Sequence, residues 1–361
     1  MNRKENVKLL AFYLPQYHPI PENDSWWGRG FTEWRNVAKA KPSFPGHYQP
    51  HIPADLGFYD LRLPGAREAQ AELAKEYGIH GFCYYHYWFN GKRLLERPFN
   101  EVLKSGKPDF PFCFAWANET WTRRWDGMDQ EILMLQDYGG EEDDQSHIEW
   151  LIKAFSDNRY IKIENKPLFL IYRGGKLPDP KRTIELWRTK VRKSGFPDIY
   201  LVSIETSFHP GWNPINAGFD ASLLFQPQFH KAFGNEAKQT LIMRLKNIIN
   251  NKSMPVYYDY KDIWPILDQV DSVDYRRYYS VCPSWDNTSR RQDNSVFIIN
   301  NSSPEEYGKW LKRAINRVKN EPPDHRIVFI NAWNEWAEGN HLEPDLKNGL
   351  SYLQATKDAL S

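Results

Sequence analysis

The sequence has few cysteines and almost no excess of charge. Its 361 residues include three cysteines, Cys83, Cys113 and Cys282, which lie in apolar runs and form no C-x-x-C pair. An odd number of thiols in such runs excludes a disulfide framework and indicates buried free thiols in a reducing compartment. The 47 Lys and Arg residues balance 46 Asp and Glu residues. No strong basic field therefore favours binding to nucleic acid or to an anionic membrane.

Long apolar runs are missing as well. No window approaches the roughly 18 uninterrupted apolar residues that a membrane-spanning helix needs. Residues 1–18 begin with basic side chains, but their apolar run breaks at Pro15 and offers no small-residue cleavage site. We therefore expect no membrane span, no signal peptide and a cytoplasmic location.

The motifs of several enzyme classes are also lacking. The sequence contains no G-x-S-x-G, no P-loop, no G-x-G-x-x-G and no H-E-x-x-H. These absences disfavour a nucleophilic serine, a bound nucleotide and a catalytic metal. We interpret the isolated His18, His86, His209 and His230 as hydrogen-bonded rim or core residues. The expectation is an enzyme without cofactor or metal.

Aromatic residues, in contrast, are abundant. The 15 Trp, 20 Tyr and 20 Phe residues exceed what core packing usually needs in tryptophan, so exposed rings are expected. Trp26, Trp27, Trp34, Trp121 and Trp125 alternate with arginines and an aspartate. They could roof a minor core, but this alternation favours a rim on which sugar rings stack.

Eight continuous apolar runs alternate with mostly helical patterns. The runs cover 7–17, 79–89, 110–118, 166–173, 199–206, 219–227, 276–285 and 326–333. The helical patterns cover 64–77, 92–104, 143–156, 180–194, 236–250, 304–319 and 349–360, whereas 208–218 offers little helix. Continuous apolar runs are typical of parallel strands covered on both faces. The sequence therefore predicts a single-domain (β/α)8 TIM barrel over 1–361, with a long irregular loop over 19–59 after its first strand. A doubly wound sheet is the alternative.

In such a barrel the residues just past each strand meet at one rim, where these enzymes work. Here the strand ends and the first long loop carry carboxylates, amides and flat rings, which suit sugar hydroxyls and the C–H faces of pyranoses. The predicted substrate-binding residues are Tyr13, Gln16, His18, Trp27, Glu33, Trp34, His86, Trp88, Asn118, Glu119, Trp121, Arg173, Glu205, Gln226, Trp285, Asp286, Asn334 and Trp336. The predicted partner is an oligosaccharide or polysaccharide.

Three carboxylates, Glu335, Glu338 and Glu343, follow the last apolar run beside two tryptophans. Glycosidic cleavage typically uses two carboxyl groups, one as acid and one as base or nucleophile. Glu335 and Glu338 are three residues apart, so one turn could aim both at the same pocket, and we predict them to be catalytic. Alternatively, Glu338 is an ion-pair residue of a turn. Glu119 is the competing acid, unless it forms a structural salt bridge with Arg123 or Arg124.

Five segments resemble a known family. "AFYLPQYH", "NDSWWGRGFTEW", "YYHYWF", "WANETWTRRWDG" and "NAWNEWAEGNHLEPD" are similar to the glycoside hydrolase family 99-like proteins of the WbsX type, and together they span nearly the whole chain. This branch is often labelled as glycosyltransferases of bacterial surface-polysaccharide clusters.

The resemblance implies a (β/α)8 barrel and a retaining mechanism without metal. In the family motif N-E-W-x-E-G the first glutamate deprotonates the 2-hydroxyl of the sugar, which attacks the anomeric carbon to give a 1,2-anhydro sugar. The second glutamate protonates the leaving group and then activates water. These roles fall on Glu335 as base and Glu338 as acid/base. The endo-mannosidases of the family typically have histidine where this chain has Ala337, so mannose is not implied.

The sequence thus predicts a carbohydrate-active enzyme that cleaves or transfers a glycosidic bond of a surface-type glycan. One alternative is a sugar-nucleotide glycosyltransferase of lipopolysaccharide or O-antigen biosynthesis, although no D-x-D stands out in a strand-end loop. The other is a glycan-binding protein without turnover.

Overall fold

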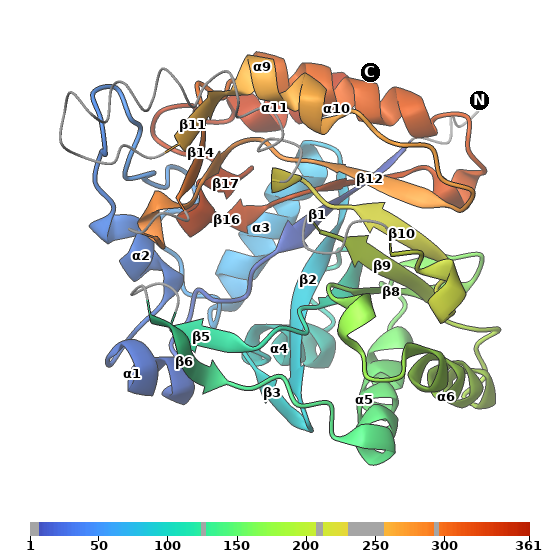
Figure 1. Cartoon of the computed structure of the whole chain (residues 1–361). Coiled ribbons are helices and arrows are strands. Elements are labelled where there is room, and N and C mark those ends of the chain that lie inside the picture. Colours follow the sequence, from blue (N-terminus) through green and yellow to red (C-terminus); the bar gives the residue numbers. More distant parts are fainter. Residues whose placement is uncertain (1–6, 124–127, 207–211, 230–255, 292–295) are drawn as a thin grey trace.

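The computed structural model describes residues 7–123, 128–206, 212–229, 256–291 and 296–361. Eight parallel strands form a closed ring (Figure 1). They are β1 (Lys8–Tyr13), β2 (Ile79–Phe89), β4 (Phe112–Trp116), β8 (Lys166–Ile171), β9 (Tyr200–Glu205), β10 (Ala221–Leu224), β12 (Arg277–Val281) and β15 (Ile327–Ile330). Each strand pairs with its neighbours in chain order, and β1 closes the ring by pairing with both β2 and β15. The predicted TIM barrel is confirmed, and the open doubly wound sheet is excluded.

Helices return the chain between most of these strands. They are α3 (Pro64–Glu76), α4 (Arg97–Ser105), α5 (Gly140–Phe155), α6 (Pro180–Lys193), α9 (Tyr260–Leu267), α10 (Pro304–Val318) and α11 (Ser351–Ala359). The start of α10 follows the usual capping chemistry, because the Ser303 side chain accepts a hydrogen bond from the Glu306 N–H and Pro304 fills the first turn. Between β9 and β10 the described residues form only the short 3-10 helix η3 (Ile215–Ala217), as expected. The predicted helix over 236–250 lies outside the described residues.

Two local predictions are wrong. The helix expected from residue 92 begins at Arg97, because β3 (Lys92–Leu94) pairs back onto β2 through a turn in which Asn90 and Gly91 both have positive φ. The loop over 19–59 was expected to be irregular, but it contains α1 (Pro21–Trp27) and α2 (Glu33–Lys39). Helices this short depend on tertiary packing, so sequence periodicity reveals them poorly.

Further strands extend the carboxyl ends of the barrel. The hairpin of β5 (Trp121–Arg123) and β6 (Met128–Met134) follows β4, and it lies beside α1 in Figure 1. The short strands β16 (Asn334–Glu335) and β17 (Asn340–His341) pair after β15, on either side of the 3-10 helix η6 (Trp336–Glu338). A separate three-stranded sheet contains β11 (Val256–Asp259), β14 (Phe297–Asn300) and β13 (Trp285–Asp286), with the 3-10 helix η4 (Asn287–Ser289) after β13. A last two-residue strand, β7 (Lys162–Ile163), pairs with β8.

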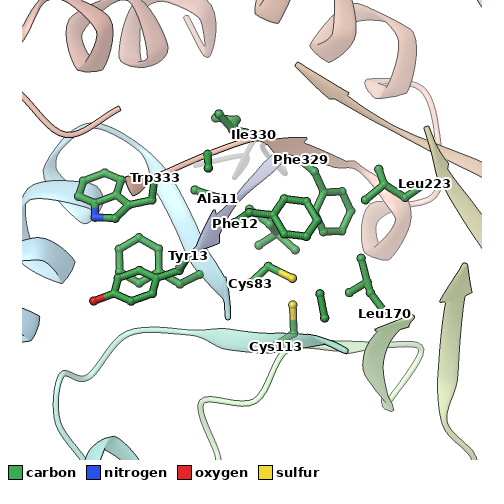
Figure 2. Packing of buried hydrophobic residues seen from close by; sticks show 14 of the residues in the cluster. Ala11, Phe12, Tyr13, Cys83, Cys113, Leu170, Leu223, Phe329, Ile330 and Trp333 are labelled. Carbon is green, nitrogen blue, oxygen red and sulfur yellow. The ribbon is translucent and has the colours of Figure 1, made fainter. Parts of the chain in front are cut away.

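The barrel interior is filled by side chains from facing strands. Figure 2 shows Phe12, Phe329 and Leu223 together with Cys83 and Cys113, whose sulfur atoms face each other. All three cysteines are free and buried, as predicted. Tyr13 and Trp333 lie on the other side of β1, toward the helical layer (Figure 2). Because successive residues of a strand point to opposite faces, both faces of β1 are buried and its run is continuously apolar.

The tryptophans are less exposed than expected. Every tryptophan in the described part of the chain is buried or partly buried, and Trp125 lies outside it. Many of the rings therefore serve the core and the helical layer. None of the helices that the structure describes combines the length and the apolar character that crossing a membrane requires.

Candidate active site

A cavity of about 290 Å³ opens at the carboxyl ends of the barrel strands. Each of the eight strands, or the loop that follows it, contributes to the lining. The main lining residues are Leu14, Gln16, Trp27, Tyr85, Tyr87, Glu119, Trp121, Tyr172, Thr206, Phe225, Phe229, Trp285, Arg290, Arg291, Glu335 and Glu338. Aromatic walls around a few charged groups are typical of a ligand site, and this end of a TIM barrel is where active sites lie.

At the base of the cavity one arginine binds three carboxylates. Arg290 donates from Nη1 to Oε1 of Glu338 at 2.6 Å, from Nη2 to Oε2 of Glu335 at 2.9 Å, and from Nε to Oε1 of Glu33 at 2.8 Å. The three acids and the arginine come from the loops after β1, β12 and β15, which are adjacent in the barrel. The side chain of Arg290 is 11% exposed, those of Glu335 and Glu338 are 7% and 23% exposed, and that of Glu33 is fully buried.

This arrangement shifts the proton affinities of its members. Burial raises the pKa of Glu335 to about 8, because the charged form loses water; Arg290 opposes this rise and Glu338 adds to it. Burial also raises the pKa of Glu338, against the same arginine. Burial alone would lower the pKa of Arg290, but the three carboxylates raise it well above its usual range. One guanidinium cannot neutralise three carboxylates, so the cluster favours retaining a proton on one of its acids.

The backbone holds the two glutamates on a tight turn. Asn334 fixes the start of this turn, because its side-chain Oδ1 accepts from the Leu14 N–H and its Nδ2 donates to the Leu14 carbonyl. Gly339 ends it with φ at +56°, and a Cβ there would lie 2.9 Å from the Cβ of Asp286. Only glycine combines that backbone conformation with so close an approach. The glycine of the motif therefore sets the position of Glu338 next to the loop that carries Arg290.

The third acid of this segment has different surroundings. Glu343 is 2% exposed and accepts three hydrogen bonds, from Trp336 Nε1 at 2.6 Å, Gln70 Nε2 at 2.6 Å and the Tyr59 hydroxyl at 2.8 Å. It does not line the cavity. Burial raises its pKa to about 7, although the three donors lower it. Glu343 thus anchors the motif from behind.

Some of the predicted site residues line the cavity and others do not. Those in the lining are Gln16, Trp27, Glu119, Trp121, Trp285, Glu335 and Glu338. Four others, Glu33, Trp34, Asn334 and Trp336, support the cavity from behind. Glu33 binds Arg290, while Trp34 donates to the Tyr59 carbonyl at 2.8 Å and packs on Trp336 with ring centroids 5.6 Å apart. These four residues position the cavity wall and are not part of it.

The residues chosen on β2 point away from the cavity. His86 Nε2 lies 2.9 Å from His147 Nε2, and Trp88 donates to Asp143, so both contact α5. The neighbouring Tyr85 and Tyr87 line the cavity instead. The same shift by one position occurs after β8 and β10. Tyr172 lines the cavity in place of the predicted Arg173, and Phe225 in place of Gln226. Because these strands are buried on both faces, the sequence does not show which alternate residues face inward, and in each pair the predicted residue does not line the cavity.

The other predicted residues also lie outside the lining. Tyr13 donates to Gln70, His18 is buried, Glu205 forms an ion pair with Arg277 at 3.0 Å, and Asp286 accepts from Gln49 and contacts His47. These contacts hold loops and helices in place. Polar residues at these strand ends therefore have structural partners, and no substrate is needed to explain their presence.

Glu119, the competing acid, lines the cavity but has its own partner. It forms an ion pair with Arg173 at 2.6 Å, whereas Arg123 binds Glu131; Arg124 lies outside the described residues. The expected salt bridge exists, but with a different arginine. Asn118 supports it, because its Oδ1 accepts from the Arg173 N–H at 2.7 Å and its Nδ2 donates to the Arg173 carbonyl at 3.1 Å. The Glu119 side chain is 42% exposed, so it is far better solvated than Glu335.

Arg290 is the lining residue at the centre of this cluster that the sequence did not reveal. Its segment, "PSWDNTSRR", follows β12. A basic residue in a loop has many possible partners, and only the fold brings this one to both glutamates of a distant motif. Within the described ranges, one group of side chains has the composition and spacing of a metal site, namely His51, His341 and Asp345, and these residues do not line the cavity. The histidines His209 and His230 lie outside the described residues.

Comparisons with known proteins agree with the fold. The model of a family described as "Glycosyltransferase WbsX" matches residues 9–356. "Uncharacterized protein WxcX" of Xanthomonas campestris pv. campestris, strain B100, is 43% identical over 354 residues, which cover 98% of this chain and 49% of the relative. The chain therefore spans about half the length of such relatives.

Solved structures resemble the chain over almost its full length. A structure titled "Glycoside hydrolase-like protein" covers 99% of this chain and 94% of its own, with a TM-score of 0.60 and 13% identity. A GH99 endo-alpha-mannosidase from Bacteroides thetaiotaomicron covers 97% of this chain and 96% of its own, with a TM-score of 0.57 and 16% identity. At these identities the likeness concerns the fold. Family and fold together support a carbohydrate-active protein.

Proposed function

The chain belongs to the WbsX glycosyltransferase family, and we propose that it is an enzyme that cleaves or transfers glycosidic bonds with Glu335 as its base and Glu338 as its acid/base. The observation that carries the proposal is the pair of carboxyls, buried in Glu335 and partly buried in Glu338, that share one guanidinium in an aromatic-lined cavity. A protein that only binds glycans has no need for two acids so costly to bury.

The two acids supply the proton transfers of a retaining reaction. In the mechanism that the resemblance implies, Glu335 takes the proton of the 2-hydroxyl, and the resulting oxygen attacks the anomeric carbon. The glycosidic oxygen leaves with a proton from Glu338. The same carboxylate then deprotonates water or a sugar hydroxyl, which opens the 1,2-anhydro ring, while Glu335 returns its proton to the 2-oxygen. The net reaction exchanges one glycosidic partner and consumes no cofactor.

Arg290 is well placed to keep one acid of the pair ionised while burial keeps a proton on the other. Glu335 is the more deeply buried of the two, so in the free protein burial favours the proton on Glu335. The resemblance places that proton on Glu338 in the reacting complex. The two assignments predict different responses to the leaving group, because only an acid becomes dispensable when the leaving group needs no proton.

The aromatic lining suits the rest of the substrate. Trp27 at the end of α1 and Trp121 at the start of β5 are both partly buried in the cavity wall. Such rings pack on the C–H faces of pyranoses, while Gln16 and Glu119 offer polar atoms to hydroxyls. The pocket therefore favours a neutral oligosaccharide chain.

A second candidate is a sugar-nucleotide glycosyltransferase, which the description of the family favours. It requires a site for a diphosphate. Arg290 in the lining already binds three carboxylates, which leaves Arg291 as the other arginine of the lining to meet the charges of a diphosphate. Where the enzyme transfers a sugar, we therefore expect the donor to be another glycoside and not a sugar nucleotide.

The test is turnover of activated aryl α-glycosides and surface oligosaccharides by wild type, Glu335→Gln and Glu338→Gln, without added metal or nucleotide. We expect both variants to lose about 10²- to 10⁴-fold in kcat on natural leaving groups. An activated aryl leaving group departs without a proton. On such a glycoside we therefore expect the variant that lacks the acid to regain turnover, whereas the variant that lacks the base stays slow. Glu205→Gln is the matched control, since this acid forms its own ion pair with Arg277 and does not line the cavity. Wild-type rates in both variants would disprove the proposal, and consumption of a sugar nucleotide alone would favour the second candidate.

A further inference from the structure

A second polar cluster lies next to the catalytic segment, on the side away from the cavity. His51 Nδ1 is 2.9 Å from His341 Nε2, and His341 Nε2 is 4.0 Å from Oδ2 of Asp345. The three ligand atoms lie within 4.8 Å of one another, and all three residues are buried. A small cavity of about 50 Å³, lined by these residues together with Tyr48 and Ser284, adjoins the cluster.

The hydrogen bonds of His341 orient one ring nitrogen into this cluster. Its Nδ1 lies 2.8 Å from the Glu343 carbonyl, which can only accept, so Nδ1 carries the hydrogen. A neutral ring then presents its lone pair at Nε2, toward His51 and Asp345. Histidines that bind metals have this arrangement, in which a carbonyl holds the other nitrogen and fixes the tautomer.

The ligand types fit a transition metal, and so does the spacing of the two imidazoles, whereas the 4.0 Å between His341 Nε2 and Oδ2 of Asp345 must shorten when the ion binds. Metal–nitrogen bonds of about 2.0–2.1 Å place two neighbouring ligand nitrogens about 2.9–3.4 Å apart, which includes the distance between His51 and His341. Two imidazoles and one carboxylate suit Zn²⁺ better than the oxygen-seeking Mg²⁺ or Ca²⁺. The adjoining cavity has room for a water molecule as a fourth ligand.

Two features act against a cation. The two histidines can instead share a hydrogen bond, donated by His51 Nδ1 to His341 Nε2. Lys347 also brings positive charge to the same region, with its Nζ 4.4 Å from the centre of the Tyr48 ring. However, Oδ2 of Asp345 accepts from Asn348 Nδ2 at a long 3.2 Å, and it retains capacity for a metal.

We propose that His51, His341 and Asp345 form a Zn²⁺ site that fixes the catalytic segment. His341 lies opposite Asn334 in the β16–β17 pair, and its ring stacks on Trp336 with centroids 3.7 Å apart. Trp336 lies between Glu335 and Glu338 in the chain. A metal on His341 would therefore hold the turn that carries both glutamates, without contact to the substrate. The site does not depend on the proposed function, since a glycan-binding protein would bind the metal equally.

The test uses the whole chain, stripped of metal with a chelator and titrated with ZnCl₂ by calorimetry and with CoCl₂ by visible absorption. We expect one ion per chain, a rise in Tm with added Zn²⁺, and the absorption bands of tetrahedral Co²⁺. His51→Gln and Asp345→Asn should each weaken Zn²⁺ binding by at least tenfold, whereas His325→Gln, a buried histidine bonded to Tyr278, should leave it unchanged.

Asp345→Asn nearly preserves shape, so it provides a test if His51→Gln fails to fold. Failure of the folded wild type to bind Zn²⁺ at micromolar concentrations would overturn the proposal and leave a hydrogen-bonded histidine pair. Equal binding by wild type and both variants would overturn it as well.

Discussion

The segment after β15 brings buried acids into two different surroundings. On the cavity side, Glu335 and Glu338 share the guanidinium of Arg290 and border open space. On the opposite side, Glu343 has three hydrogen-bond donors and does not line the cavity. The difference teaches that the burial of an acid does not by itself indicate catalysis. What distinguishes the catalytic candidates is a shared counter-ion, repulsion between neighbours and access to a ligand.

The largest expected effect is on stability and follows from Arg290→Met. Removal of the arginine takes away the cation that binds the buried Glu33 and Glu335 and the partly buried Glu338, which should lower the free energy of unfolding by about 3–5 kcal/mol at pH 8. The loss should be smaller at pH 5. Without the arginine, the folded-state pKa values of the two glutamates stay above their unfolded values, so stability persists at low pH and is lost as pH rises. Urea unfolding at both pH values measures this difference.

Arg173→Met is the control for that experiment, since its partner Glu119 is 42% exposed and remains in water after the substitution. We expect a loss of about 1 kcal/mol with little dependence on pH. If both arginine variants lose the same free energy of unfolding, the cluster around Arg290 is no different from an ordinary ion pair. In the wild type, the contribution of Glu335 alone to stability should fall as pH rises from 4.5 toward 8, the interval over which its raised pKa acts.

Trp34→Ala tests the side behind the cavity. The Trp34 ring packs on Tyr17, Tyr59 and Trp336 and is 8% exposed, so its truncation should cost about 3–5 kcal/mol. Thermal unfolding measures the loss. A variant that keeps wild-type stability but loses glycan binding would place Trp34 in the cavity wall.

Glu343→Gln and Glu338→Gln provide a direct comparison of the two acids. In Glu343→Gln the new amide would turn an N–H group toward groups that themselves donate, so we expect a loss of about 1–3 kcal/mol in stability and a smaller loss of turnover. Glu338→Gln removes one of three like charges and should leave stability within about 1 kcal/mol of wild type while turnover falls. Urea unfolding and kcat, measured on the same preparations, separate the two patterns. If both variants behave alike, the two sides of the segment are not functionally distinct.

The smallest expected effect comes from Trp27→Ala. This partly buried ring lines the cavity and contacts Phe31 and Arg123, so its loss should weaken glycan binding about tenfold and stability by less than about 1 kcal/mol. Calorimetric titration with an oligosaccharide measures the first quantity and thermal unfolding the second. Trp121→Ala should affect both, because that ring also packs on Tyr87 at 5.0 Å. Unfolding of Trp27→Ala at room temperature would assign that ring to the core.

The sequence by itself determined the eight apolar runs, their alternation with helices and the two glutamates of the last motif. These features are local, because periodicity, chain breaks and residue spacing are visible along the chain. The sequence also located the glycine that ends the glutamate turn. The close approach of Asp286 that makes it necessary became visible only in the fold.

Only the tertiary structure decided which side of each strand faces the cavity. Tyr85 and His86 are adjacent in the same aromatic run, and the closure of the barrel sets which of them points inward. It likewise decided that Arg290, 45 residues before Glu335, binds both acids, and that Glu343 does not line the cavity. Strand parity and long-range ion pairs depend on how the ring of strands closes, and no local pattern encodes that closure.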